Sequence, residues 1–510
     1  MALQYLVDYA AENLSVVIAI ALVAVIFAAA SIMSSKAGSS SLPGPWSLPV
    51  VGNIFLFGSS PHRNVTNLAK HYGDVFSMKL GSMEAVILNS VDVVKEALVK
   101  RASDFSGRPP LHTFLLSSNG GQNVAFTDFG KRYIQNRRAL DLALQTQTQD
   151  SVAFTEKIQA EADALVCSLL NSRKEKFNSA NQIGNIAASL QIGLFFGERL
   201  RSRYLKEAQE LMDHSTDFIE NSAVGNVVDF MPWVKTVFKS QVRKVDETVR
   251  GLTTFVRKLY QLRMREIQEK GDESTTIADT LIKIKKNQDK YLASDENGNS
   301  SDEVDFDNER VINLMADSFG GGYEKLGTAM KWFVAYLVAY PEAQEQLYQE
   351  IAHVKGTNPI SLEDKKKLPL LEATVLEVLR RSCFLPFALP HCTVRDTTVA
   401  GYKLPKDTIV FVNLWGCCHD PKYFKDPFKF NPLRHLDTKQ QQVKPNSCMM
   451  AFSDGDRRCP GEGYAKSALF ILMGTLVQRL RVRNGTEEPI EEKFGLTLRP
   501  KSHSVRVQAR

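Results

Sequence analysis

A cysteine near the C-terminal end of the chain, Cys459, has the surroundings of a reactive thiol. Pro460 and Gly461 follow it and break the backbone just before a helical pattern over residues 464–480. A cysteine in a tight turn at a helix N-terminus faces unpaired backbone N–H groups and the positive end of the helix dipole. Both effects favour the thiolate, which is the form that binds metals. The turn therefore predicts an activated cysteine.

The residues spaced around Cys459 indicate which metal group it would bind. They read Phe-x-x-Gly-x-Arg-x-Cys-x-Gly from Phe452 to Gly461. A thiolate is the proximal ligand that a haem iron needs for cleavage of an O–O bond. Arg457 can donate a charge-assisted hydrogen bond to a haem propionate. A structural cysteine in a loop is the alternative, and the combined pattern favours the haem ligand.

A charged pair further upstream, Glu377 and Arg380, shares one face of a predicted helix. Such pairs are common on surfaces, but apolar residues flank this one on both sides. Buried charges need partners, and the candidate third member is Arg434, in the segment Asn-Pro-Leu-Arg-His. We expect these three residues to form a buried ion-pair network.

Three consecutive glycines, at positions 320–322, interrupt a long helical pattern. Each costs a helix roughly 1 kcal/mol relative to alanine. They predict a local distortion or the close approach of something large and flat. A simple break between two helices is the alternative.

Tyr133 and Arg137 lie four residues apart on one face of another predicted helix. Arg137 could bind an anionic group there. The alternative is a solvated basic face, because the helix also carries Lys131, Arg132 and Arg138.

Composition places the chain among ordinary globular proteins: 510 residues, 44% hydrophobic, 24% charged and a net charge of +6. The modest charge, with no basic tract interleaved with aromatic residues, predicts no nucleic-acid partner. The cysteines are odd in number and scattered. This pattern indicates neither a disulfide framework nor a CxxC zinc site, and it favours a reducing, cytosol-facing environment.

The N-terminal segment between Glu12 and Lys36 carries no charge. It comprises roughly 23 residues, which span about 34 Å as a helix and can cross a bilayer. Acid before the segment and lysine after it place the rest of the chain in the cytosol. A cleaved signal peptide is the alternative, disfavoured because no basic stretch precedes the segment. We expect a membrane anchor over residues 1–36, a serine- and proline-rich hinge over 37–50, and one catalytic domain over 51–510.

Periodicity predicts a fold that is mainly α with a minor β part. Alternating apolar runs at residues 75–80 and 85–89 predict a hairpin, and helical spacing dominates residues 93–379. A polar, acidic stretch at residues 293–308 predicts an exposed loop. Strand-like runs return at residues 407–414 and near the C-terminus.

In their order along the whole chain, these motifs resemble those of the haem-thiolate cytochromes P-450, especially animal microsomal members that oxidise xenobiotics, steroids and fatty acids. The resemblance implies the P-450 fold and haem b as cofactor, with Cys459 as the axial ligand of the iron. It further implies that Glu377, Arg380 and Arg434 support the cysteine turn. The haem-binding residues would be Tyr133, Arg137, His391, Phe452, Arg457 and Cys459.

Three positions depart from the family pattern. Tyr133 stands where tryptophan is usual, and His435 stands where phenylalanine is usual. Most important, Lys325 replaces a threonine whose hydroxyl helps deliver protons to oxygen, although the preceding acid, Glu324, is kept. Glu324 and Lys325 are the candidate catalytic residues. The ammonium must pair with an acid, extend away from the haem or lose its proton.

The resemblance implies a monooxygenase of the endoplasmic reticulum, held by a single-pass anchor with its catalytic domain facing the cytosol. It would insert one atom of O2 into a lipophilic substrate such as a steroid, fatty acid or xenobiotic. Since the chain has no flavin or nicotinamide fingerprint, electrons would come from NADPH–cytochrome P-450 reductase, with a small haem electron-transfer protein as a second candidate. Lys325 keeps two alternatives open: a reductase-independent isomerase or dehydratase acting on a peroxide, and a haem- or sterol-binding membrane protein with little catalysis.

Overall fold

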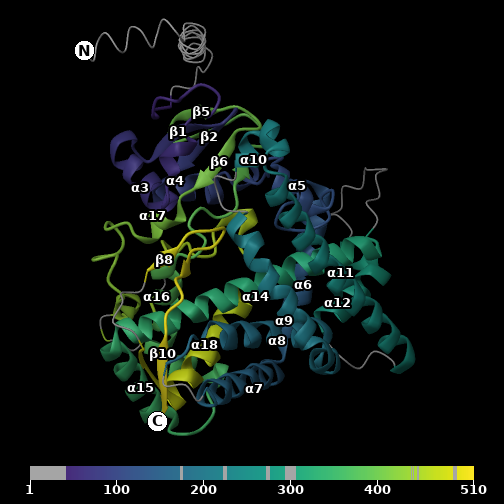
Figure 1. The fold of residues 1–510 in the computed structure, drawn as a ribbon, viewed down its shortest axis with the longest axis vertical. Helices are drawn as coiled ribbons and strands as arrows, with labels where there is room; N and C mark the ends of the chain where they lie inside the picture. Colours follow the sequence, from purple (N-terminus) through teal and green to yellow (C-terminus); the bar gives the residue numbers. More distant parts are fainter. Residues whose placement is uncertain are drawn as a thin grey trace, which may run out of the picture.

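A computed structural model describes residues 42–172, 176–221, 227–270, 276–292, 306–437, 439, 442–444, 447–485 and 491–510. The predicted fold class, mainly α with a minor β part, is confirmed (Figure 1). The helices are α3 (Pro61–Tyr72), α4 (Val91–Lys95), α5 (His112–Ser118), α6 (Lys131–Gln149), α7 (Ser151–Leu170), α8 (Ala180–Phe196), α9 (Glu198–Asn221), α10 (Val227–Phe230), α11 (Lys239–Lys270), α12 (Ile277–Lys286), α13 (Gln288–Leu292), α14 (Asn308–Ala339), α15 (Pro341–Lys355), α16 (Pro369–Ser382), α17 (Leu414–Cys418) and α18 (Glu462–Arg479).

The largest sheet lies at one end of the molecule (Figure 1) and has the strand order β1-β2-β6-β3. The predicted hairpin is confirmed: β1 (Val75–Leu80) pairs antiparallel with β2 (Met83–Leu88). β6 (Ile409–Val412) joins β2 in parallel and is buried along its whole length. β3 (His391–Cys392) closes the order, antiparallel to β6. The sheet thus brings the segment before His391 alongside the N-terminal strands.

Three two-stranded ribbons complete the β part. β4 (Thr397–Val399) pairs with β5 (Tyr402–Leu404). Near the C-terminus, β7 (Leu480–Asn484) pairs with β10 (Val505–Ala509), and β8 (Glu492–Lys493) pairs with β9 (Arg499–Pro500). The ribbon β8–β9 brackets the short segment 494–498, which reaches the central helix.

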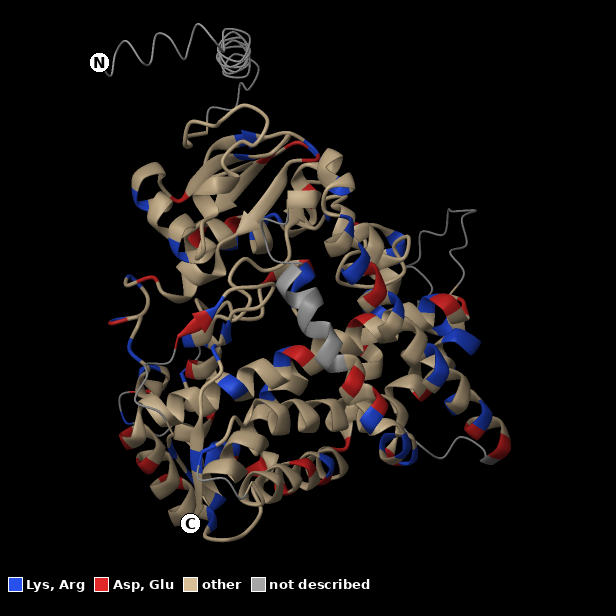
Figure 2. Ribbon diagram, viewed as in Figure 1, with Lys and Arg blue, Asp and Glu red and all other residues tan. Residues whose placement is uncertain are grey.

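Helix α14 crosses the middle of the molecule and contacts α8, α11, α16 and α18 (Figure 1). It begins after Asp307, whose side chain accepts a hydrogen bond from the backbone N–H of Arg310. Helix α18 is apolar and buried from Ala468 to Val477. In Figure 2 charged residues are frequent along α11, which has a solvent face, whereas α18 is buried over most of its length.

The three glycines do not break α14, which runs without interruption from Asn308 to Ala339. A Cβ on Gly322 would lie 2.8 Å from the side chain of Gln191 on α8, and a Cβ on Gly320 would lie 2.8 Å from Leu252 on α11. A Cβ on Gly321 would meet nothing within 4 Å. The alternative, a break between two helices, is therefore wrong. Two of the glycines allow neighbouring side chains to pack closely, and the third faces open space.

None of the helices in the described part of the chain combines the length and the apolar composition needed to cross a membrane. The predicted anchor, residues 1–36, lies outside the described residues, as do residues 37–41 of the predicted hinge and residues 293–305 of the predicted acidic loop. The end of the hinge is described, and there the carbonyl of Pro43 accepts a hydrogen bond of 2.8 Å from the backbone N–H of Ser77 in β1.

Candidate functional site

Cys459 lies between a short 3-10 helix, Gly455–Arg457, and the start of α18. Its backbone N–H donates to the carbonyl of Phe452 at 3.0 Å, which closes the turn. Gly455 has a φ of 70°, and a Cβ there would lie 1.7 Å from the carbonyl oxygen of Leu98. Only glycine fits this conformation and this contact. The glycine of the motif thus fixes the turn against the segment that follows α4.

Arg457 ties the turn to two other segments. Its guanidinium donates to the carbonyls of Ser106 (2.7 Å), Val124 (3.1 Å) and Thr127 (2.8 Å), and it stacks 3.6 Å above the ring of Tyr133. Burial lowers the pKa of Arg457 to about 10, so the group remains a cation at neutral pH. Every guanidinium nitrogen has a carbonyl partner, and this makes Arg457 a structural clamp as well as a possible anion ligand.

Tyr133 and Arg137 of α6 contact the same turn. The Tyr133 hydroxyl donates to the carbonyl of Asp456 at 2.6 Å. Arg137 donates to the carbonyl of Arg458 at 2.6 Å and forms an ion pair of 2.8 Å with Asp141. The predicted face of α6 is therefore turned toward the cysteine, rather than being a solvated basic face at these two positions.

A cavity of about 420 Å³ opens above the cysteine and is lined mostly by apolar side chains. The Cys459 side chain is exposed, but it is exposed to this cavity inside the molecule. Burial raises the pKa of its thiol, although the backbone N–H of Gly461 acts in the opposite direction. The argument that the turn alone favours the thiolate is therefore wrong for the free thiol, because the surroundings have a low dielectric.

One edge of the cavity is basic. It carries Arg457, Arg137, His391 and a residue that sequence reasoning does not single out, Arg108. Arg108 is buried and donates to the carbonyls of Ala125 (2.8 Å) and Pro390 (2.9 Å). Burial and then the charge of Arg457 lower its pKa well below the usual value. In the sequence, Arg108 lies between a glycine and two prolines, which restrict the backbone. That setting is the signal that could have revealed Arg108.

His391 completes this edge as a neutral group. Its Nδ1 lies 2.8 Å from the carbonyl of Phe105. Burial, and then the charge of Arg108, lower the pKa of His391 well below its ordinary value. With Nδ1 bound as a donor to that carbonyl, Nε2 is an acceptor, so the cationic character of the edge comes from the arginines.

These residues fit a haem. Arg457 lowers the pKa of Arg108, and Arg137 lowers the pKa of Arg457, so the neighbouring guanidinium groups of this edge repel each other. Anionic groups at this edge would relieve the repulsion. The cavity has largely apolar walls, arginines along one edge and a thiol at one end. A haem, which is planar and apolar with two carboxylates on one side, matches these groups.

The opposite wall of the cavity is formed by α14. Lys325 lines it and forms an ion pair of 3.0 Å with Glu324. The other Glu324 oxygen accepts from the hydroxyls of Thr328 (2.9 Å) and Thr497 (2.6 Å). Burial raises the pKa of Glu324, but Lys325 and the hydroxyls lower it more, and the net shift is downward. Of the three options for the ammonium, the structure shows pairing with an acid.

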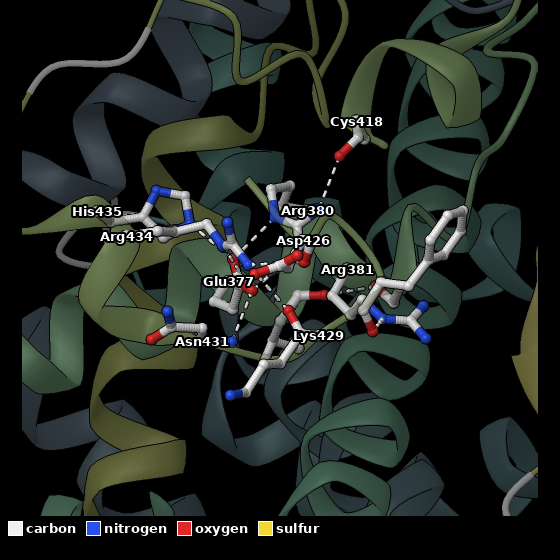
Figure 3. A network of polar contacts seen from close by, with 12 residues as sticks. Glu377, Arg380, Arg381, Cys418, Asp426, Lys429, Asn431, Arg434 and His435 are labelled. Carbon is white, nitrogen blue, oxygen red and sulfur yellow. Dashed lines mark hydrogen bonds and ion pairs between the residues drawn. The ribbon is translucent and has the colours of Figure 1, made fainter. Parts of the chain in front are cut away.

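The predicted triad is present (Figure 3), with Glu377 and Arg380 fully buried and Arg434 largely so. Glu377 forms two hydrogen bonds with Arg380, at 2.8 and 2.9 Å, and one with Arg434 at 3.1 Å. The backbone N–H of Asn431 and the imidazole of His435 add contacts of 2.9 Å each. His435, which departs from the family pattern, is therefore a fourth side chain of the network. Sequence reasoning missed it because His435 lies 58 residues from Glu377, and sequence spacing does not show which way its imidazole points.

The network continues to the cysteine turn. Arg380 donates to the carbonyl of Cys418 at 2.7 Å (Figure 3), and the Cys418 sulfur accepts from the backbone N–H of Met450. Met450 in turn accepts a hydrogen bond from Ser453, inside the turn. A chain of hydrogen bonds thus links the buried carboxylate of Glu377 to the loop that carries Cys459.

A mainly helical fold with a thiol at the base of an apolar cavity, and three arginines at its edge, defines a haem-thiolate protein. The family model for cytochrome P450 matches residues 42–507, so the chain belongs to the cytochrome P450 family. It is accordingly a monooxygenase that uses a haem iron, O2 and electrons from a partner.

Individual relatives support the same assignment. The chain is 36% identical to cytochrome P450 1A1 of Sparus aurata and 35% identical to that of Opsanus tau. Each alignment covers 93% of this chain, together with 91% and 92% of the respective relative. A solved structure of a zebra fish cytochrome P450 with abiraterone superposes with a TM-score of 0.73 at 25% identity, covering 88% of this chain and all of that one.

Replacing Glu377 by alanine should lower the free energy of unfolding by about 3–5 kcal/mol, because it leaves buried cations without their anion. Denaturant unfolding and haem content per chain measure this effect. Glu491→Ala is the matched control: Glu491 forms an exposed pair with Lys501, and its loss should cost less than about 1 kcal/mol. Equal, small effects of both substitutions would show that the network is not needed for stability.

The same carboxylate predicts a pH dependence. Burial raises its pKa, but Arg380 and His435 more than offset that and lower it to about 2. A carboxyl that has a lower pKa in the folded than in the unfolded state stabilises the fold above the unfolded value of about 4.3. That contribution is lost as the pH falls toward 2. The unfolding free energy of Glu377→Gln, measured from pH 5 downward, should fall less steeply than that of the natural chain.

Proposed function

We propose that this enzyme oxidises lipophilic substrates, such as steroids, fatty acids or xenobiotics, at the end of the cavity that contains Cys459. The observation that supports this proposal is the largely apolar cavity that ends on the thiol. The haem, when bound, supplies the activation of O2. Phe126, Phe195, Leu252, Leu385 and Leu496 bind and orient a substrate by apolar contact and exclude water from the reacting end.

Cys459 is the proposed axial ligand of the haem iron. Arg108, Arg137, Arg457 and His391 would bind the propionates. Tyr133 holds the cysteine turn through the Asp456 carbonyl and places its ring under Arg457, while Phe452 packs along the same wall of the cavity. The network of Glu377, Arg380 and Arg434, with His435, positions the turn from behind.

The electron donor in this proposal is the NADPH–cytochrome P-450 reductase, with a small haem electron-transfer protein as a second candidate. A basic surface near the cysteine turn supports docking of an acidic protein. Lys131 and Arg132 belong to the first turn of α6, whose Tyr133 contacts Asp456, and Arg138 follows in the same helix. Lys466 of α18 lies 5.6 Å from the ring of Phe452. These residues therefore lie on the two helices, α6 and α18, that adjoin the cysteine turn.

The proposed location is the membrane of the endoplasmic reticulum, with residues 1–36 as a single-pass anchor, 37–50 as a hinge and 51–510 as the catalytic domain on the cytosolic side. Exposed apolar side chains on two segments support a membrane-facing surface. The first segment carries Trp46, Val50, Val51 and Phe55, and the second carries Trp233 and Val237. The two segments lie side by side, since Ile54 packs against Met231 and Val234. This surface adjoins the end of the hinge.

Cys459→Ser should abolish the absorption band that the reduced, CO-bound form of a thiolate-ligated haem shows, because the soft anionic donor is lost. The control is Cys167→Ser, on the exposed side of α7, which should keep the band at full intensity. Retention of the band in Cys459→Ser would reject the ligand assignment.

Substrate class and electron source are tested by turnover of the natural chain. We expect product formation with NADPH and added reductase, after a spectral binding screen of steroids, fatty acids and aromatic compounds has selected a ligand. Consumption of an organic hydroperoxide without NADPH, together with no NADPH-dependent product, would favour the isomerase or dehydratase alternative. Ligand binding with neither activity would favour a binding protein.

Deleting residues 1–36 should convert the enzyme from a tightly embedded protein to one that salt or mild washing releases, with its haem retained. In the truncated chain, Trp233→Ser with Val237→Ser should weaken vesicle binding about 30-fold or more, since each apolar side chain contributes roughly 1–2 kcal/mol at an interface and tenfold corresponds to about 1.4 kcal/mol. Val152→Ser, at an exposed apolar position on α7, is the control and should leave binding unchanged. A truncated chain that stays embedded would contradict the single anchor.

A further inference from the structure

Two buried cysteines that the proposed function does not use, Cys383 and Cys418, contact each other. Cys383 follows the last residue of α16, and Cys418 is the last residue of α17. Their exposures are 2% and 0%, and the Cys383 thiol donates a hydrogen bond to the sulfur of Cys418. The two helices thus bring a pair of thiols together inside the protein, where a single buried cysteine would act only as a small apolar residue.

The backbone at Cys383 has a conformation that cysteine rarely adopts. Its φ of 35° and ψ of 53° are left-handed. The residue in this conformation after a helix is most often glycine, which has no Cβ to strain. The backbone N–H of Cys383 still ends the helix regularly, by donating to the carbonyl of Leu379. A cysteine is therefore kept where the backbone alone favours glycine, and strain of this kind concentrates at functional positions.

The two thiols of the pair have different surroundings. The hydrogen bond from Cys383 lowers the pKa of the Cys418 thiol, and the charge of Arg380 and the backbone N–H of Met450 act in the same direction, against burial. Burial, and then the hydrogen bond to Cys418, raise the pKa of Cys383 well above its ordinary value. Cys418 is thus the better nucleophile, and Cys383 is the neighbouring thiol that can complete a disulfide.

The pair lies behind the wall of the cavity. Phe384, the residue after Cys383, lines the cavity, and so does Leu414, one helical turn before Cys418 in α17. A small molecule released in the cavity is therefore formed close to both thiols. Hydrogen peroxide is such a molecule, because O2 that takes up two electrons and two protons without transfer of oxygen to a substrate leaves as hydrogen peroxide.

We propose that Cys383 and Cys418 are a site of reversible oxidation, at which hydrogen peroxide converts the two thiols to a disulfide. The Cys418 sulfur attacks one peroxide oxygen, the O–O bond breaks, and the other oxygen leaves as water with the thiol proton. The Cys383 sulfur then attacks the sulfenic acid on Cys418. The S–O bond breaks, the S–S bond forms, and a second water leaves with the proton of Cys383.

The electrons of this reaction balance. Two electrons pass from the two sulfur atoms to the peroxide, which is reduced to two molecules of water. Two molecules of a small thiol such as glutathione return the electrons by thiol–disulfide exchange and are themselves oxidised to a disulfide. A disulfide on the cytosolic side of a membrane is typically transient and redox-sensing, which agrees with a modification that is made and removed.

The disulfide acts on the cysteine turn through contacts that Cys418 already makes. Its carbonyl accepts from Arg380 at 2.7 Å (Figure 3), and its sulfur accepts from the backbone N–H of Met450. Met450 in turn accepts from Ser453 in the turn. An S–S bond is much shorter than a hydrogen-bond contact, so its formation pulls the end of α17 toward α16 and away from Met450. The loop that carries Cys459 loses one support, and the haem is held less tightly.

The first test measures the disulfide itself. Haem-loaded protein is treated with hydrogen peroxide, the remaining thiols are alkylated, and peptide mass spectrometry identifies the linked peptides. We expect a Cys383–Cys418 disulfide that dithiothreitol removes. Cys417→Ser is the matched control, because Cys417 is equally buried in α17 but its sulfur lies 4.0 Å from the carbonyl of Asn89. This variant should form the same disulfide, whereas Cys383→Ser should leave Cys418 oxidised but unlinked.

A trivalent arsenical tests the pairing of the thiols without an oxidant. Phenylarsine oxide bridges two sulfur atoms that lie together. It should add once to the natural chain and once to Cys417→Ser, at Cys383 and Cys418 in both. Neither Cys383→Ser nor Cys418→Ser should retain the adduct.

The second test measures how tightly the haem is held. Transfer of haem from the ferric protein to apomyoglobin should become about fivefold faster after peroxide treatment, as expected for the loss of one hydrogen bond. Dithiothreitol should restore the original rate, which separates the disulfide from destruction of the haem by peroxide. Cys418→Ser, whose hydroxyl can accept from Met450 in place of the sulfur, should show no change that dithiothreitol reverses.

Three results would overturn the proposal: no Cys383–Cys418 disulfide after peroxide, an arsenical adduct that survives in Cys383→Ser, or an unchanged rate of haem transfer in the linked protein. These measurements need neither substrate nor reductase, so they are independent of the proposed function. A natural chain that oxidises no lipophilic substrate would refute that function and would leave the disulfide result standing.

Discussion

The position of the cysteine depends on one buried carboxylate. Glu377 is fully buried and would be unstable there as a lone anion, so it is surrounded by Arg380, Arg434, His435 and a backbone N–H. Each partner belongs to α16 or to the irregular segment before the cysteine turn. Because the carboxylate must keep these contacts, it draws that irregular segment onto the helix. The Arg380–Cys418–Met450 contacts then carry the constraint to the turn itself.

A second cation restrains the turn from the other side. Arg457 binds three carbonyl oxygens from residues 106–127 and stacks on Tyr133, while Gly455 lets the backbone approach Leu98. The thiol is therefore held by two arginine-based clamps, one centred on Glu377 and Arg380 and the other joining Arg457 to residues 106–133. Rigid support from both sides is what a metal ligand requires, because ligand geometry is set by the groups that orient it.

Sequence patterns revealed the parts of this arrangement that local chemistry determines. The hairpin at residues 75–80 follows from alternation, and the grouping of Glu377 with Arg380 follows from helical spacing. Contacts between distant segments could not be read in this way. Arg108 reaches the basic edge only because β3 brings His391 and Pro390 to it. Thr497 lies 173 residues from Glu324. The glycines of α14 left a helix break open as an alternative, because propensity does not reveal that Gln191 and Leu252 pack against them.

The chain buries two glutamates in different ways, and the difference follows from their partners. Glu377 is surrounded by guanidinium groups, an imidazole and a backbone amide, none of which faces the cavity, and its environment is fixed. Glu324 is held by two hydroxyls and an ammonium, and the ammonium is one-third exposed on the cavity wall. The first arrangement holds a loop in place, whereas the second leaves a cation on the cavity wall, positioned by a buried anion.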